Sequence, residues 1–210
     1  MIKIFLLLCF LLLVFFLVWL RKDRKFKSSE SVASSYDLWT NDQLLERLWG
    51  EHIHLGFYGI PSRKKDFRDA KIDFVHELVH WSGLDQLPRG ARVLDIGCGI
   101  GGSSRILANN YGFDVLGVTV SSAQAKRAEE LTHSDLNCRF KVMNALDLKI
   151  DNGSFDGVWS VEVGAHILDK QLYADEMLRV IRPGGFLAVA DWNCRDLSVQ
   201  GMNCIEKNIM

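Results

Sequence analysis

The stretch VLDIGCGIGGSS, Val93 to Ser104, decides the fold of this protein. A short apolar run ends at Ile96, a glycine-rich turn follows, and a helical pattern begins at Ser103. Glycines let the backbone turn tightly and let a ligand approach, and the N-terminus of the next helix offers unpaired N–H groups to that ligand. The strand, turn and helix together therefore predict a ligand-binding turn at the carboxyl end of a strand.

Downstream of this turn, short β-branched runs alternate with helical stretches. The strand-like runs are RVLDIG, DVLGVTV, RFKVM, FDGVWSV and FLAVADW, and helices are expected from Ser103, around 123–131 and around 170–180. Strands that alternate with helices require right-handed crossovers and form a parallel sheet covered on both faces. Residues 91–210 are therefore predicted to form an α/β domain with a parallel-sheet core.

Upstream of this domain the chain divides into three segments. Residues 36–90 are helix-like and rich in aromatic residues and histidine, which predicts a helical cap, and residues 21–35 form a basic and polar linker. Residues 4–20 carry no charge, so residues 1–20 are predicted to be a transmembrane anchor. The cations of RKDRKFK follow at once, which places the rest of the chain on the cytoplasmic side and disfavours a cleaved signal peptide.

Composition excludes several classes of function. The 210 residues carry 25 basic and 26 acidic side chains, so there is no basic excess of the kind that binds nucleic acid. The five cysteines are scattered without a CxxC pair, which suggests neither a disulfide framework nor a thiolate zinc site.

The glycine turn matches two cofactor patterns, GxGxxG and GxGxG. A dinucleotide site needs an acidic residue about 20 positions further on to hold the ribose. Here the second strand ends GVTVS, with Thr119 and Ser121 but no carboxylate. Asp95 lies two residues before the first glycine, where it would repel a pyrophosphate and attract an ammonium group. The turn therefore favours S-adenosylmethionine over NAD.

Several blocks carry a family resemblance: VLDIGCGIGGSSRILA, GVTVSSAQAKRA, NALDL, SFDGVWSVEVGAHILDK, VIRPGGFLAVADW and, upstream, YDLWT and WGEHIHLGFYG. They resemble the methyltransferases that act on 2-methyl-6-phytyl- and 2-methyl-6-solanesyl-benzoquinols, relatives of the tocopherol methyltransferases. The resemblance covers residues 31 to about 192. It implies a class I Rossmann-like fold, S-adenosylmethionine as cofactor, and a prenylated quinol of tocopherol and plastoquinone biosynthesis as acceptor, with no metal.

The resemblance also implies which residues bind the cofactor. Those expected at its methionine and sulfonium end are Asp95, Gly97, Cys98, Gly99 and Gly101. Thr119 and Ser121 are expected near the ribose, and Asn144 and Ala145 near the adenine. The family continues beyond the fifth strand, so the chain is expected to stop before the last two strands, to bind cofactor weakly and to turn over poorly.

Methylation of a quinol carbon requires a base that takes a proton from an adjacent hydroxyl. Glu162 and His166 lie four residues apart just after the fourth strand, where open parallel sheets bind ligands. A helical segment there would bring the two side chains together. We predict His166 as the base, because its reference pKa of about 6.5 suits neutral pH, and Glu162 as the residue that orients it. His54, or its neighbour His52, is the alternative base.

The sequence HELVH, His76 to His80, matches the zinc-protease pattern HExxH. On a helical wheel Ile72, Val75, Leu78 and Val79 form an apolar arc, which leaves both histidines on the opposite, polar side. No His or Glu follows from Trp81 to Val118 to complete a zinc site, so a metal is not expected.

Together these features predict a membrane-tethered C-methyltransferase whose acceptor is a lipid-soluble prenylated quinol. A tether would raise the effective concentration of a catalyst whose substrate is confined to lipid. Two alternatives remain: a γ-tocopherol-type or other small-molecule methyltransferase, and a truncated, non-catalytic membrane protein that only binds S-adenosylmethionine.

Overall fold

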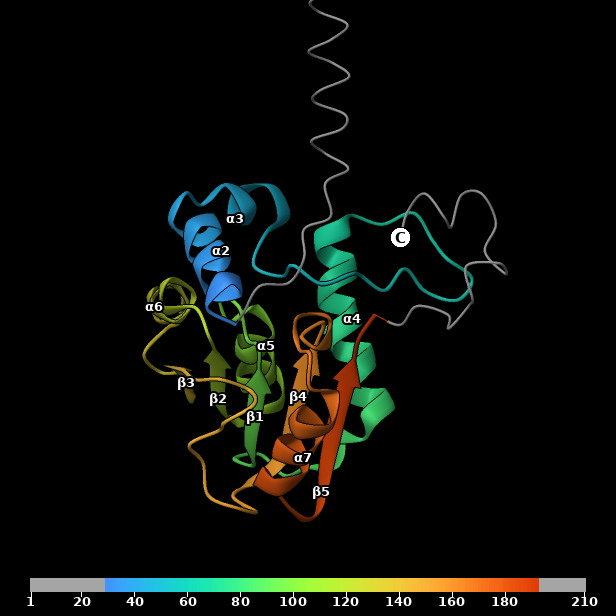
Figure 1. The fold of residues 1–210 in the computed structure, drawn as a ribbon. Coiled ribbons are helices and arrows are strands. Elements are labelled where there is room, and N and C mark those ends of the chain that lie inside the picture. The colour runs from blue at the N-terminus through green and yellow to red at the C-terminus, as the bar shows by residue number, and fades with distance from the viewer. Residues whose placement is uncertain (1–28, 193–210) are drawn as a thin grey trace, which may run out of the picture.

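A computed structural model describes residues 29–192, in which helices pack on both faces of a twisted sheet (Figure 1). No helix in this range is long and apolar enough to cross a bilayer. The predicted anchor and most of the predicted linker, residues 1–28, lie outside the described residues, as do residues 193–210.

The sheet has five parallel strands in the order β3-β2-β1-β4-β5. Their bounds are β1 Arg92–Ile96, β2 Asp114–Thr119, β3 Cys138–Val142, β4 Phe155–Val161 and β5 Ile181–Ala190. The direction of winding reverses at β1, whose neighbours are β2 and β4. Ligands of open α/β sheets bind outside the carboxyl ends of the strands at such a reversal. The predicted α/β fold with a parallel sheet is confirmed.

Two hydrophobic clusters fill the spaces between the sheet and its helices. The first lies against α4 (Phe67–Ser82), α5 (Gly102–Tyr111) and α6 (Ser122–Leu131), and the second against α7 (Lys170–Val180). The short 3-10 turns η1 (Leu84–Gln86) and η2 (Gly164–His166) follow α4 and β4. The sequence RPGG at 182–185 lies within β5, where the pairing with β4 skips from Ile181 to Phe186.

The buried residues of helix α4 differ from the predicted apolar arc near the start of the helix. Val75, Leu78 and Val79 are buried as expected, but Ile72 is 40% exposed and Lys71 is buried in its place. The reason is local: the Lys71 ammonium finds backbone carbonyl acceptors in the segment that precedes α4. Burial of a charge is tolerated when such acceptors satisfy it.

Two helices of the cap, α2 (Ser29–Asn41) and α3 (Leu44–Trp49), lie above the carboxyl ends of the strands (Figure 1). Asp37 joins α2 to the N-terminus of α6, because its Oδ1 accepts a hydrogen bond from Ser121 Oγ at 2.5 Å and from Ala123 N at 3.1 Å. The cap therefore closes over the edge of the sheet where a ligand is expected.

Candidate active site

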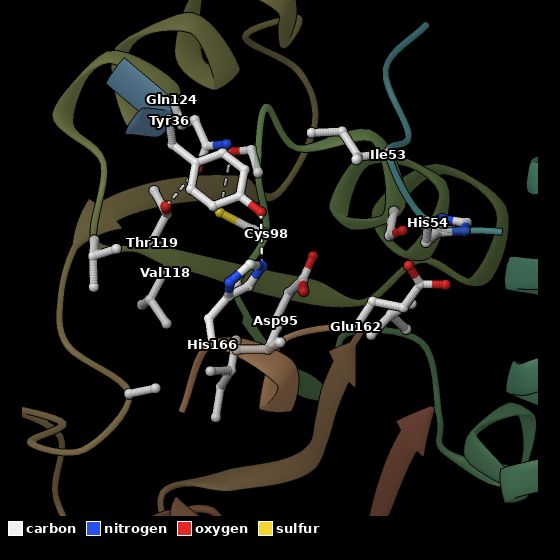
Figure 2. Close-up of a pocket in the computed structure, with 18 of the residues that line it drawn as sticks. Tyr36, Ile53, His54, Asp95, Cys98, Val118, Thr119, Gln124, Glu162 and His166 are labelled. Atoms are coloured by element: carbon white, nitrogen blue, oxygen red, sulfur yellow. Dashed lines mark hydrogen bonds between the residues drawn. The ribbon is translucent and has the colours of Figure 1, made fainter. Parts of the chain in front are cut away.

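A cavity of about 420 Å³ lies at the carboxyl ends of the strands, beneath α2 (Figure 2). Its walls come from three parts of the chain: the glycine turn after β1, the residues that end β2, β3 and β4, and the cap segment that includes Tyr36 and His54. A cavity of this size suits one ligand of cofactor dimensions.

Asp95 places a carboxyl group in the wall of this cavity (Figure 2). The residue is 2% exposed, and its Oδ2 accepts a hydrogen bond from Ser104 Oγ at 2.5 Å. Burial raises the pKa of Asp95 to about 7, although the Ser104 hydrogen bond opposes this. A buried carboxyl with no cationic neighbour is well suited to pair with an ammonium group of a ligand.

The glycine turn supplies the floor beside Asp95. Gly97, Gly99 and Gly101 all have positive φ, at 75°, 56° and 83°. A Cβ on Gly99 would meet no atom within 4 Å, whereas one on Gly101 would press on Phe140 and Arg105. Gly99 therefore leaves open space inside the cavity, while Gly101 is required for packing. Burial keeps the pKa of the Cys98 thiol well above its ordinary value, so this wall is uncharged.

Of the two residues expected near the ribose, the structure places Thr119 in the cavity wall and Ser121 outside it. Thr119 lines the cavity and donates a hydrogen bond to Gln124 Oε1 at 2.7 Å. Ser121 is fully buried outside the cavity lining, and its hydroxyl caps α6 by accepting from Gln124 N while donating to Asp37. Ser121 therefore does not face the cavity, where the ribose was expected, because its hydroxyl is hydrogen-bonded to Asp37 of the cap and to the backbone of α6.

Asn144 and Ala145 both line the cavity beyond the end of β3. Asn144 Oδ1 accepts a hydrogen bond from Leu146 N at 3.0 Å, which stabilises the turn that follows Asn144. Its amide N–H groups remain able to donate to a ring nitrogen or a hydroxyl.

Tyr36 and His166 form a pair at the mouth of the cavity (Figure 2). The Tyr36 hydroxyl lies 3.0 Å from His166 Nε2, and the two rings meet edge to face. Burial, with Glu162 nearby, raises the pKa of Tyr36, so its hydroxyl stays protonated and can donate to Nε2 when that nitrogen carries no proton.

Glu162 does not orient His166 as predicted. Its Oε1 instead accepts a hydrogen bond from Leu55 N at 2.9 Å, and its carboxylate lies on the His54 side of the cavity (Figure 2). The backbone at Glu162 has φ of 56°, a left-handed conformation that non-glycine residues adopt rarely. Since the chain turns sharply here rather than continuing as a helix, the two side chains diverge to different partners.

His54 belongs to a short hydrogen-bonded chain in the strap, which we define as residues 50–57. His54 Nδ1 donates to Leu55 O at 2.7 Å, and His54 Nε2 lies 3.1 Å from His52 Nδ1. Burial lowers the pKa of His54 and lowers that of His52 to about 3, so both rings are neutral. With both nitrogens engaged, His54 has no lone pair free for a substrate proton.

Lys71 holds this strap in place from α4. Its Nζ donates to Trp49 O at 3.0 Å and to His52 O at 2.7 Å, on either side of the Glu51 position. Desolvation lowers the pKa of Lys71 to about 8. Arg105 ties Glu51 to the glycine turn, since it donates to Glu51 Oε2 at 2.6 Å and to Ile100 O at 2.9 Å. The first residues of the strap are therefore held between α4 and the glycine turn.

The HExxH histidines serve other contacts. His76 Nδ1 lies 2.7 Å from the Tyr111 hydroxyl, and His80 Nδ1 lies 2.7 Å from Asp85 Oδ2. In the part of the chain that the structure describes, no group of three or more His, Cys, Asp or Glu side chains is placed to hold a metal ion.

The sequence did not single out Tyr36 and Gln124, which line the cavity, or Lys71, which holds the strap. Tyr36 belongs to the YDLWT block, which carried the family resemblance and was the one available signal for it. Lys71 lies next to an apolar position of an amphipathic helix, and Gln124 lies in the first turn of another, so neither has a local signature.

The fold, the glycine turn and the buried carboxyl together define an α/β protein with a cofactor site at the end of its first strand. The family described as "Methyltransferase domain" matches residues 94–189. A 2-methyl-6-phytyl-1,4-hydroquinone methyltransferase from Synechocystis sp. is 55% identical over 92% of this chain and 61% of its own length. The chain belongs to the methyltransferase family.

Two further comparisons extend this relationship. The chloroplastic tocopherol O-methyltransferase of Arabidopsis thaliana is 36% identical over 80% of this chain and 51% of its own length. The chain thus spans between one half and two thirds of these curated relatives. The chain is also similar to a solved geranyl diphosphate C-methyltransferase from Streptomyces coelicolor, in complex with Mg²⁺, a geranyl thiolodiphosphate and S-adenosyl-L-homocysteine. The two superpose with a TM-score of 0.62 at 25% identity, over 76% of this chain and 63% of that one. The resemblance to quinol and tocopherol methyltransferases is confirmed.

Proposed function

We propose that this protein is an S-adenosylmethionine-dependent C-methyltransferase of a prenylated benzoquinol, of the 2-methyl-6-phytyl- or 2-methyl-6-solanesyl type. The observation that carries the proposal is that one cavity holds both the buried Asp95 carboxyl and the Tyr36–His166 pair. The first suits a cationic cofactor and the second a phenolic acceptor. The 55% identity to a phytyl-hydroquinone methyltransferase supports this choice of acceptor.

The cavity fits the proposed cofactor by its chemistry and its space. Asp95 offers a negative partner for the amino group, Gly99 leaves room beside it, and Asn144 offers amide donors at the far side. When bound, S-adenosylmethionine supplies a methyl group that its sulfonium already activates. The protein has to align the acceptor with that methyl group and to exclude water.

The Tyr36–His166 pair removes the acceptor proton. A quinol hydroxyl at the cavity mouth donates its proton to Tyr36 Oη as Tyr36 passes its own to His166 Nε2. The resulting phenolate raises the electron density of the ring carbon that takes the methyl group. That carbon then loses its own hydrogen as a proton, which restores the aromatic ring, and the quinol oxygen takes back the proton held by the Tyr36–His166 pair. Because a phenolic pKa lies near about 10, this transfer has to occur within the site rather than in bulk water.

We further propose that residues 1–20 anchor the protein in a membrane, with the methyltransferase domain on the cytoplasmic side. The run of apolar residues followed at once by cations supports the anchor, and an acceptor dissolved in lipid gives it a purpose. The anchor is separate from the catalytic proposal, which depends on residues 29–192 alone.

The decisive experiment combines calorimetry with S-adenosylmethionine and a methyl-transfer assay on phytyl quinol, solanesyl quinol and γ-tocopherol. We expect binding of S-adenosylmethionine and methylation of one of the two quinols. Preference for γ-tocopherol would favour the tocopherol-type alternative, which the 36% identity to a tocopherol O-methyltransferase supports. Binding without transfer to any acceptor would favour a non-catalytic protein.

A further inference from the structure

Exposed apolar side chains gather in one segment of the described chain, residues 38–60. Nine large hydrophobic residues of this segment are exposed: Leu38, Trp39, Leu44, Leu48, Trp49, Ile53, Leu55, Tyr58 and Ile60. We call these nine residues the cap surface. Single exposed apolar side chains are common, but this many in one short segment indicate that the segment contacts another molecule.

The cap surface belongs to the end of the protein at which the cavity lies. Its residues belong to α2, α3 and the loop that follows, which stand above the carboxyl ends of the strands (Figure 1). Ile53 both lines the cavity and is 41% exposed, so it joins the cavity wall to the cap surface (Figure 2). An apolar chain that leaves the cavity at Ile53 passes directly onto this surface.

The volume of the cavity indicates why such a surface is needed. About 420 Å³ accommodates one ligand of cofactor size with little space to spare. The long prenyl chain of the proposed acceptor must therefore lie outside the cavity. In water its apolar surface would be exposed, whereas against lipid it would stay buried.

The chain itself indicates that the partner is a membrane. The segment RKDRKFK, residues 21–27, carries five cations against one Asp, and α2 begins at Ser29, two residues after Lys27. Two residues span at most about 7 Å, so an anionic headgroup layer that binds these cations lies close to the helix that begins the cap. Trp39 and Trp49, each 48% exposed, are of the residue type that favours this interface.

We propose that the cap surface inserts into the headgroup region of an anionic bilayer and receives the prenyl chain of the acceptor directly from the lipid. The role of the prenyl chain rests on the proposed function. Contact between the cap surface and lipid does not, so the two can be tested separately.

Contact is measured by fluorescence quenching in vesicles of phosphatidylglycerol and acyl-brominated phosphatidylcholine. The full chain is used with Trp19→Phe as background, which removes the tryptophan of the apolar run. Trp39→Phe and Trp49→Phe should each lower the fraction of emission that bromine quenches. Trp81→Phe is the matched control, because Trp81 is 79% exposed in the last turn of α4, and its removal should raise that fraction.

Either of two results would overturn the proposal. One is an equal effect of the three substitutions on lipid quenching. The other is an unquenched Trp39 and Trp49 together with a dimer in sedimentation that Leu48→Glu dissociates, which would make the cap surface an interface between copies.

Delivery of the acceptor is tested with Leu48→Glu and its control Leu178→Glu on α7, since the two leucines are 59% and 60% exposed. Leu48→Glu should lower the rate on vesicle-embedded phytyl quinol by about tenfold, given the apolar contact it removes. It should leave the rate on a short-chain, water-soluble quinol unchanged. Equal losses on both acceptors would refute delivery. If the unsubstituted chain methylates no quinol, the proposed function fails, and the quenching result still decides the contact with lipid.

Discussion

The hydroxyl of Tyr36 lies 3.0 Å from Nε2 of His166, although 130 positions separate the two residues in the chain. Tyr36 comes from the cap and His166 from the turn after β4, so the pair forms only when α2 is seated on the sheet. Asp37, the next residue, secures that seating through Ser121. The proposed proton removal therefore depends on the seating of α2, the helix that carries Tyr36.

This relationship predicts the kinetics of substitutions in the pair. His166→Ala should lower turnover by about 10²-fold while leaving cofactor affinity nearly intact, as expected for loss of a general base. Tyr36→Phe should also lower turnover, and the double substitution should cost less than the sum of the two, because the residues act as a unit. Steady-state kinetics with calorimetry of S-adenosylmethionine measures both effects. If His166→Ala retains turnover while His54→Ala loses it, the base lies in the strap.

A second prediction concerns space in the glycine turn. Gly99→Val should abolish S-adenosylmethionine binding, because the new side chain enters open cavity space. Gly90→Val is the matched control: Gly90 also has positive φ, at 83°, and a Cβ there likewise meets no atom within 4 Å. Both variants pay the left-handed backbone cost of about 1–2 kcal/mol. Equal affinity of the two variants for S-adenosylmethionine by calorimetry would contradict the assignment of the turn.

A third prediction follows from the pKa of Asp95, raised to about 7 by burial. Between about 4, its value when unfolded, and about 7, the folded protein holds a proton that the unfolded chain has released. Asp95 therefore contributes a term to the free energy of unfolding of the ligand-free protein that falls as pH rises through this window, while the lowered pKa values of the buried His52 and His54 contribute an opposing rise. Affinity for S-adenosylmethionine should rise over the same window, because the carboxylate pairs with the ammonium group.

Asp95→Asn tests both halves of that prediction. It should raise the free energy of unfolding at pH 8, measured by urea denaturation, because it removes a buried charge. It should also weaken cofactor binding and remove the pH dependence of affinity between pH 5 and 8. The free energy of unfolding should then rise with pH in the lower part of this window, because the contribution of His52 and His54 is no longer opposed. A variant that retains the parent's pH dependence of affinity would show that another group titrates.

The fourth prediction concerns the strap. Lys71→Met removes the donor of two backbone carbonyls, those of Trp49 and His52, and should cost about 1–3 kcal/mol of stability. It should also weaken cofactor binding, since the strap lines the cavity. Lys126→Met is the control, because Lys126 is 79% exposed and should change stability by about 0.5 kcal/mol at most. Chemical denaturation measures the stability and calorimetry measures the cofactor affinity. Equal stability and equal affinity of the two variants would show that Lys71 does not hold the strap.

Local sequence patterns determined the architecture of this protein. The strand and turn at Val93 to Ser104, the expected helix around 170–180 and the alternation of strands with helices all reappear in the structure. These features depend on periodicity and on glycine conformations, which operate within a few residues and are therefore visible in the chain itself. Asp95 was found in the same way, because its position relative to the turn is fixed by the strand that carries it.

Only the tertiary structure decided which polar side chains meet. Glu162 pairs with the strap rather than with His166, because the backbone turns left-handed after β4. The Ser121 hydroxyl donates a hydrogen bond to Asp37, which lies 84 positions away in the chain. Lys71 is buried because the backbone carbonyls of Trp49 and His52 accept hydrogen bonds from its ammonium group. Each of these contacts depends on how the cap packs on the sheet, and such long-range packing leaves no periodic trace in the sequence.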